Sequence, residues 1–142
     1  MREWDCDRLV RNGRVVWASC MVACGDADGA VTGNTRRFGA SLDKIKQVVN
    51  PRPGEIMFGL NLVVHKGKTI FVADTSVHEY PSSEHMSEIA IYSARVVRLF
   101  VFDPKVDFVS HYTFGQPLTS RTQQINTAVA LLTDRKFDCQ LD

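Results

Sequence analysis

The 142-residue sequence lacks a long hydrophobic run and lacks an excess of charge of either sign. A membrane-spanning helix needs about 20 consecutive apolar residues, and no run approaches that length, so we expect no membrane partner. The 17 Lys and Arg residues oppose 16 Asp and Glu residues, which leaves a formal net charge of +1. Because binding to nucleic acid rests on concentrated positive charge, we expect no nucleic-acid partner either.

Cysteine is scarce, and the four cysteines follow no regular spacing: Cys6, Cys20, Cys24 and Cys139. The N-terminus, Met-Arg-Glu-Trp-Asp, does not resemble a signal peptide. We therefore expect a cytoplasmic protein whose thiols are reduced and buried. Cys20 and Cys24 would share one face of a helix, where metal ligation or redox sensing is the alternative to two core thiols.

Recognisable metal and nucleotide motifs are also missing. The sequence has no His-x-x-x-His or Cys-x-x-Cys pair, which a zinc site would favour, and no G-x-G-x-x-G after a strand, which would bind a dinucleotide. Asp26, Asp28, Asp74 and Glu79 could attract a hard cation, but an Asp after a strand more often bonds its own backbone. We predict no metal site, and no cofactor bound by this chain.

The centre of the chain alternates between strand and helix patterns. Thr69–Ala73 is a short apolar run typical of a buried strand. A helix follows, with Ser82 as its N-cap and Pro104 just past its end. Val106–Val109 is a second apolar run. A strand, a helix and a strand in this order predict a right-handed βαβ crossover.

Flanking segments continue this alternation. Val15–Cys24 is apolar on every side and predicts a buried helix, which Gly25 ends. The polar link between Ile56–Val64 and the strand at 69–73 contains Gly67 and predicts a hairpin. Further predicted elements are a helix at Ser41–Val49 capped by Ser41, a helix at Ser120–Leu132, a possible short strand at Ala30–Thr32 and a strand beginning at Lys136–Leu141.

These elements predict an α/β fold with a mixed, mostly parallel sheet that includes one antiparallel pair. We expect residues 1–142 to form one partial domain, because the chain begins on an apolar helix and ends on a strand just begun. A domain of this length normally buries roughly two-thirds of its unfolded surface. The sequence therefore predicts a domain truncated at both ends.

The first candidate site follows the predicted strand at 106–109. Ligands of open α/β sheets bind at the carboxyl ends of the strands. Hydroxyl groups and free loop N–H groups there can hold phosphate oxygens. The alternative is that these residues only cap a helix or line a turn. The candidate residues are Ser110, His111, Thr113 and Gly115.

A second candidate site lies in a polar loop near the N-terminus. Two adjacent arginines beside Gly and Thr could clamp a phosphate or pyrophosphate, because a guanidinium offers paired donors. The alternative is a solvated basic loop. The residues are Thr32, Gly33, Thr35, Arg36 and Arg37.

Three blocks of sequence occur in one order: GDADGAVTGNTRRFGASLDKIKQVVNPRPGE at 25–55, FVADTSVHEYPSSEHMSEIAIYSA at 71–94 and KVDFVSHYTFGQP at 105–117. Together they resemble the phosphate acetyltransferase family. The TGNTRRF and ADTSVHE segments resemble, in particular, the acetyltransferase-like C-terminal region of bacterial NADP-dependent malic enzymes. The resemblance extends from about residue 9 to residue 141.

This resemblance implies a three-layer αβα domain of the isocitrate/isopropylmalate dehydrogenase-like fold, within a two-domain protein whose cleft lies between the domains. Phosphotransacetylases move an acetyl group between acetyl phosphate and coenzyme A. In malic enzymes the corresponding region is regulatory, binds acetyl-CoA and helps to form the oligomer. The NADP and divalent metal of those enzymes belong to a separate part. We thus expect an acyl-CoA or acyl phosphate ligand and a homo-oligomer.

Some positions depart from that family. Its catalytic Ser-Arg pair and following Asp match no position here, so the resemblance implies no catalytic residue in this chain. His78 stands where the family usually has Asn, and His85 where it usually has an acidic residue. We predict a regulatory binding domain. The alternatives are an active phosphotransacetylase, in which Ser110 and Thr113 orient phosphate, and a degenerate fragment that assembles through its apolar helix at 15–24.

Overall fold

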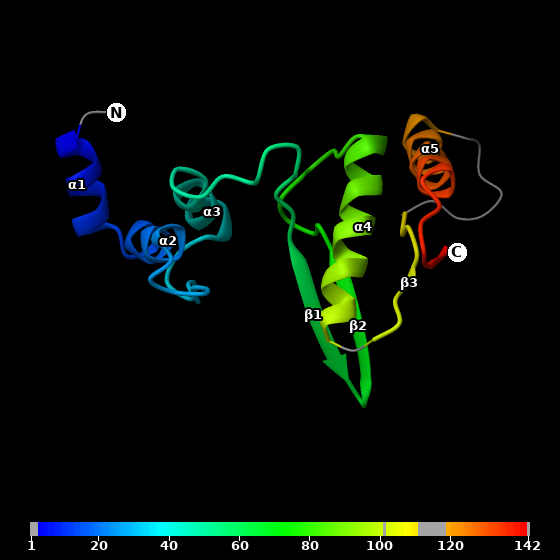
Figure 1. Cartoon of the computed structure of the whole chain (residues 1–142), viewed down its shortest axis with the longest axis horizontal. Coiled ribbons are helices and arrows are strands. Elements are labelled where there is room, and N and C mark those ends of the chain that lie inside the picture. The colour runs from blue at the N-terminus through cyan, green and yellow to red at the C-terminus, as the bar shows by residue number, and fades with distance from the viewer. Residues whose placement is uncertain (1–2, 101, 111–118, 142) are drawn as a thin grey trace. The chain divides into compact units, whose positions relative to one another are not determined.

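The computed structural model describes residues 3–100, 102–110 and 119–141, and it divides the chain into two compact units (Figure 1). The first unit is Met1–Glu55 and the second is Ile56–Asp142. In each unit, some helix side chains are buried. In the part of the chain that is described, no helix is both long and apolar enough to cross a membrane.

The described residues of the first unit form three helices: α1 (Glu3–Asn12), α2 (Arg14–Cys24) and α3 (Phe38–Lys46). Helix α2 packs against both of the others. Its buried residues, Val15, Val16 and Ser19, all precede its last five residues. The predicted helix at 15–24 is therefore confirmed, but it is only partly buried, and 54% of Trp17 is exposed.

Glycines mark both ends of α2. A Cβ atom added to Gly13 would lie 2.8 Å from the carbonyl oxygen of Leu9. The close approach of the chain to α1 at this point is therefore possible only because glycine has no side chain. Gly25 ends the helix at φ +80°, in the left-handed region. The N–H of Asp26 then donates to the carbonyl oxygen of Met21 at 2.8 Å. The prediction that Gly25 stops the helix is confirmed.

Two predictions for the first unit were wrong. Helix α3 begins at Phe38 with Arg37 as its N-cap residue, so Ser41 is not the cap but a buried residue inside the helix. The Phe38-Gly39-Ala40 segment contains no proline, and the helix can extend through it. Ala30–Thr32 is not a strand, because no described strand pairs with it.

The second unit begins with an antiparallel hairpin, β1 (Leu60–His65) and β2 (Lys68–Ala73). The two turn residues, Lys66 and Gly67, have φ values of +46° and +76°. Positive φ at both positions is what the tight hairpin turn requires, and the right-handed twist of the strands favours it. The hairpin prediction is confirmed, although β1 begins at residue 60 rather than residue 56.

Helix α4 (Ser83–Leu99) packs against β2 and against α5 (Ser120–Asp134) (Figure 1). The Ser82 hydroxyl oxygen accepts a hydrogen bond from the N–H of His85 at 3.2 Å, which confirms Ser82 as the N-cap. Small side chains let the two helices approach closely. The buried apolar residues of this pair are Ile89, Ala90, Ala94, Val97, Ala128 and Leu132.

The remaining described strands are β3 (Lys105–Val106) and β4 (Gln140–Leu141), which pair in parallel. Among the described strands none joins β3 to β2, so the predicted βαβ crossover was wrong. Strand β3 is only two residues long, and its partner comes from the end of the chain instead. The α/β class is confirmed, with two small sheets of which one is antiparallel. The three-layer, mostly parallel sheet stays a prediction.

Candidate anion-binding site

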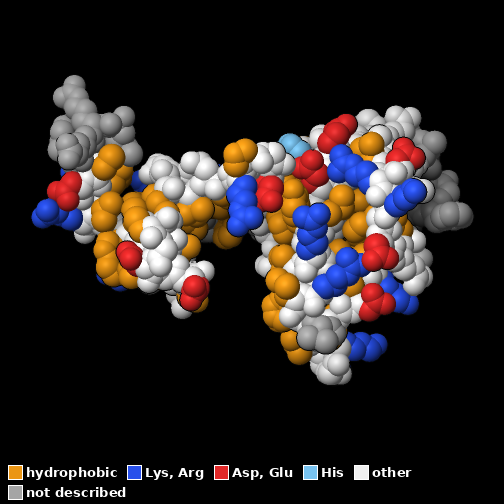
Figure 2. All heavy atoms as spheres, in the orientation of Figure 1, with side chains coloured by type: hydrophobic (Ala, Val, Ile, Leu, Met, Phe, Trp, Pro, Cys, Tyr) orange, Lys and Arg blue, Asp and Glu red, His pale blue; other side chains and the backbone are white. Residues whose placement is uncertain are grey.

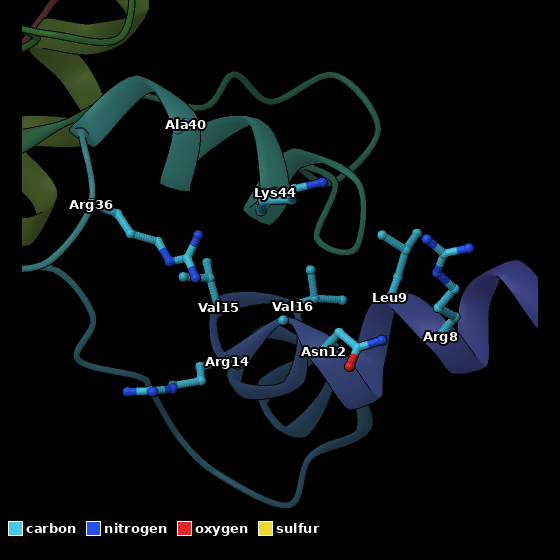
Figure 3. Close-up of a pocket in the computed structure, with 10 residues that line it drawn as sticks. Arg8, Leu9, Asn12, Arg14, Val15, Val16, Arg36, Ala40 and Lys44 are labelled. Carbon is cyan, nitrogen blue, oxygen red and sulfur yellow. The ribbon is translucent and has the colours of Figure 1, made fainter.

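A pocket of about 740 Å³ opens in the first unit, lined by residues of all three of its helices (Figure 3). Four cationic residues contribute to its wall: Arg8 of α1, Arg14 of α2, Arg36 from the loop before α3, and Lys44 of α3. Among the described residues that line it, none is acidic. Unopposed cations in a recess attract an anion, and each guanidinium offers paired donors to phosphate oxygens.

The same pocket has an apolar part. Leu9, Val15, Val16 and Ala40 line it beside the cations (Figure 3). Val15 and Val16 are only 7% and 5% exposed, so their side chains are fixed by packing in the core of the unit. A wall of this kind suits an anion that also carries an apolar group.

A second pocket, of about 650 Å³, shares Arg14, Val15 and Arg36 with the first. The loop predicted from the sequence lines it with Thr32, Gly33, Thr35 and Arg36. In this loop the N–H of Thr35 donates to the carbonyl oxygen of Gly33 at 2.8 Å, and Gly33 has φ +141°. The tight turn therefore brings four of the five predicted residues to one wall.

Arg37 is the exception in this loop. It lines neither pocket, and its backbone serves as the N-cap position of α3. The adjacent arginines are thus separated by the structure: Arg36 belongs to the candidate site, whereas Arg37 is an exposed residue at the start of a helix.

Arg8, Arg14 and Lys44 were missed by sequence reasoning. None of the three belongs to a recognisable binding motif in the sequence, and 36 positions separate Arg8 from Lys44. Only the packing of α2 against α1 and α3 brings them to one pocket. The one available signal was that Arg8 and Arg14 flank the Asn12-Gly13 break between two helices.

The other predicted site is largely outside the described residues. His111, Thr113 and Gly115 lie there, and only Ser110 is described, as a partly buried residue. Strand β3 ends at Val106, so Ser110 does not directly follow a strand. The phosphate-binding role of this loop stays a prediction.

A buried carboxylate stands at the end of the hairpin in the second unit. Asp74 has a side chain that is 6% exposed, and its Oδ2 lies 2.7 Å from Nδ1 of His78. Its backbone N–H donates to the carbonyl oxygen of Gly59 at 2.6 Å. Within the described ranges no three residues of His, Cys, Asp or Glu are placed to hold a metal ion. Asp74 thus links the loop after β2 to Gly59, the residue just before β1.

The four cysteines are free, but the prediction that they are buried was wrong. Cys6 and Cys24 are exposed, and Cys20 and Cys139 are partly buried. Cys24 is the last residue of α2, and the fully buried residues of this helix all precede it. Burial raises the pKa of the Cys139 thiol, and the nearby Arg98 guanidinium opposes that shift.

The whole chain, residues 1–142, matches the Phosphate acetyl/butaryl transferase family, and the protein belongs to that family. It is 36% identical over 138 residues to the NADP-dependent malic enzyme of Rhizobium meliloti, which covers 97% of this chain and 18% of that enzyme. It is 26% identical over 136 residues to the phosphate acetyltransferase of Nitratidesulfovibrio vulgaris, covering 95% of this chain and 19% of that enzyme. The chain thus spans about a fifth of the length of these relatives.

Solved structures show the same fold. A phosphotransacetylase from Streptococcus pyogenes aligns with a TM-score of 0.80 at 22% identity, over 98% of this chain and 43% of that one. The EutD phosphotransacetylase from Staphylococcus aureus aligns with a TM-score of 0.71 at 24% identity, over 90% of this chain and 40% of that one. The chain is a phosphate acetyltransferase-like domain, homologous to a region of malic enzymes, and the predicted resemblance is confirmed.

Proposed function

We propose that this chain is a regulatory domain that binds acetyl-CoA or acetyl phosphate in the cationic pocket of its first unit. One observation carries the proposal: four cations and no described acidic residue line a recess that also has an apolar wall. Phosphate oxygens would accept hydrogen bonds from the guanidinium groups. The relatives include enzymes named for phosphate acetyl transfer, whose ligands would have this chemistry.

Binding rather than turnover is favoured by the lining of the two pockets. Acyl transfer to a thiol needs a group that removes the thiol proton. The described lining residues include no Asp, Glu, His or Cys that could do so. The volume of about 740 Å³ falls in the range of small-molecule sites. A ligand held there would act by stabilising one state of the protein that carries it.

The test is isothermal titration calorimetry with acetyl-CoA and, separately, acetyl phosphate. We expect Arg36→Ala to weaken binding at least about tenfold, because it removes a charge-assisted contact. Arg37→Ala is the matched control and should bind as the wild type does, since Arg37 lines neither pocket. Equal losses in the two variants, or no binding by the wild type, would refute the proposal.

A second matched pair lies on α3. Lys44 lines the pocket, whereas Lys46, in the last turn of the same helix, does not. Lys44→Ala should weaken binding of the same ligand, and Lys46→Ala should leave it unchanged. This pair changes the net charge equally, so a general electrostatic effect would appear in both variants.

We also propose that the domain contributes to a homo-oligomer. On the face of the hairpin opposite Phe71, Val63, Ile70 and Val72 are 47%, 58% and 38% exposed. Figure 2 looks onto the α4 side of this unit and shows hydrophobic side chains along its edge at β1. Ile70→Lys should lower the sedimentation coefficient if copies associate there. An unchanged value would exclude the hairpin as the contact.

We also propose a layer architecture and a cellular compartment for the domain. In a protein that carries the remainder of the family fold, we infer a three-layer αβα domain around a mostly parallel sheet, in the cytoplasm. The likeness to phosphotransacetylase structures over 98% of the chain supports the fold. An experimental structure that includes the flanking elements would test it, and β1 and β2 remaining an isolated pair would contradict it.

A further inference from the structure

Two histidine rings meet beside the start of α4. His78 lies in the loop after β2, and His85 lies in the first turn of α4. Their ring centroids are 5.7 Å apart, and the ring planes are tilted by 40°. His85 is exposed, and 27% of the His78 side chain is exposed, so both rings can be reached from solvent. The contact therefore joins the loop after the hairpin to the helix that packs on β2.

A buried carboxylate fixes one of these two rings. Oδ2 of Asp74 lies 2.7 Å from Nδ1 of His78, and the Asp74 side chain is only 6% exposed. When the Nδ1–H group of the neutral ring donates to the carboxylate, Nε2 carries the lone pair. Histidines that bind metal ions usually donate their other ring N–H to a carboxylate in this way. Nε2 of His78 is therefore available as a ligand atom.

The other oxygen of this carboxylate is a second observation that favours a bound cation. Oδ1 of Asp74 is buried and accepts no hydrogen bond from the described residues. No lysine or arginine in the described part of the chain forms an ion pair with Asp74 either. A buried carboxylate that is incompletely paired costs free energy, because it has lost its contact with water. A metal ion on Nε2 of His78 would supply positive charge close to this carboxylate.

The spacing of the two rings fits one ion held between them. At metal–nitrogen distances of about 2.0–2.1 Å and a tetrahedral angle, two ligating imidazoles have ring centroids about 5 Å apart. The observed separation of 5.7 Å is close to this value, and rotation of the exposed His85 side chain can close the difference. Imidazole favours Ni²⁺, Cu²⁺ and Zn²⁺, whereas Mg²⁺ and Ca²⁺ prefer oxygen ligands.

We propose that His78 and His85 bind one divalent transition-metal ion of the Ni²⁺, Cu²⁺ and Zn²⁺ type, with Asp74 as a positioning residue behind His78. The two imidazoles are the protein ligands, and water completes the coordination, because no group of three His, Cys, Asp or Glu residues in the described chain is placed to hold a metal ion. The ion links the loop after β2 to α4. This site lies in the second unit and is independent of the ligand proposed for the cationic pocket of the first.

The experiment titrates the full chain, without a polyhistidine tag, with Ni²⁺ by isothermal titration calorimetry. Ni²⁺ is the probe because the free thiols do not reduce it. We expect one saturable site per chain. His78→Asn, which can still donate to Asp74, and His85→Gln should each weaken binding at least about tenfold, because each removes one of two imidazole ligands. Asp74→Asn should weaken it about tenfold, as loss of a carboxylate behind a ligating histidine usually does.

The matched control is His65→Gln, which removes an exposed histidine at the end of β1 and should bind Ni²⁺ as the wild type does. Thermal unfolding is a second readout, because an ion that binds only the folded protein raises the melting temperature. Ni²⁺ should raise it in the wild type and in His65→Gln, but not in His78→Asn or His85→Gln. Circular dichroism of each variant without metal checks that it is folded. A wild-type protein without saturable binding, or equal binding by His85→Gln and His65→Gln, would overturn the proposal.

Discussion

Ser82 shows what a single side chain contributes to the second unit. Its hydroxyl oxygen accepts the N–H of His85 and so satisfies one backbone donor at the start of α4. We expect Ser82→Ala to lower the free energy of unfolding by about 1 kcal/mol, as loss of an N-cap usually does. Urea denaturation measures this change. Ser76→Ala, at an exposed position in the loop before the helix, is the control and should change stability little.

Glu84, in the first turn of α4, supplies a prediction about pH. Its bond with its own backbone, helped by the Ser82 hydroxyl, holds the pKa of the carboxyl below its ordinary value of 4.5. A lowered pKa in the folded state means that the ionised group stabilises the protein above pH 4.5, and that this contribution is lost as the pH falls through the lower pKa.

Glu84→Gln should therefore remove part of the loss of stability seen on acidification. The urea midpoint of wild type and variant, followed from about pH 5 to about pH 3, measures it. Glu79→Gln, in the preceding loop, is the control. Identical pH profiles for Glu84→Gln and the wild type would show that the carboxylate does not contribute.

At the scale of elements, the contact between α4 and α5 holds the second unit together. Leu132 is completely buried in it. The hydroxyl of Ser83 also donates to the carbonyl oxygen of Gln124 at 2.9 Å, which links the start of α4 to α5. We expect Leu132→Ala to lower the free energy of unfolding by about 2–5 kcal/mol, because it leaves a cavity. Leu99→Ala, at a residue that is 80% exposed, should change it by less than about 0.5 kcal/mol.

At the scale of the whole molecule, the two compact units have separate cores. Leu132→Ala should therefore speed amide hydrogen exchange in α4 and α5 while the first unit keeps its protection. The amide of Trp17, which donates to the carbonyl oxygen of Gly13 at 2.8 Å, reports on that unit. Hydrogen exchange followed by NMR measures both. A parallel loss of protection at Trp17 would mean that the two units unfold together.

Local signals in the sequence predicted several elements correctly. Gly25 stops α2 because glycine adopts positive φ without strain, and Ser82 caps α4 because its oxygen reaches the free N–H groups. The hairpin was predicted because its link contains Gly67, which tolerates a positive φ. Prediction was weaker at the start of α3. Gly39 disfavours a helix and Ser41 suits an N-cap, yet the helix begins at Phe38, three residues before Ser41.

Long-range pairing could not be predicted in the same way. The strand predicted at 106–109 keeps only its first residue in β3, and that short strand pairs with β4 instead of joining the sheet of β2. Burial of the cysteines was also misjudged, because hydrophobic character alone does not say which side of a helix meets a neighbour. These properties depend on contacts between segments far apart in the chain.

The sequence by itself determined the family, the α/β class, the ends of α2 and the start of α4, because caps, turns and family motifs are local patterns that need no partner. Only the tertiary structure decided that Arg36 and not Arg37 lines a pocket, and that Arg8, Arg14 and Lys44 join it. The physical reason is that a pocket is made by packing α2 against α1 and α3, and helix packing places side chains by their direction rather than by their spacing in the sequence.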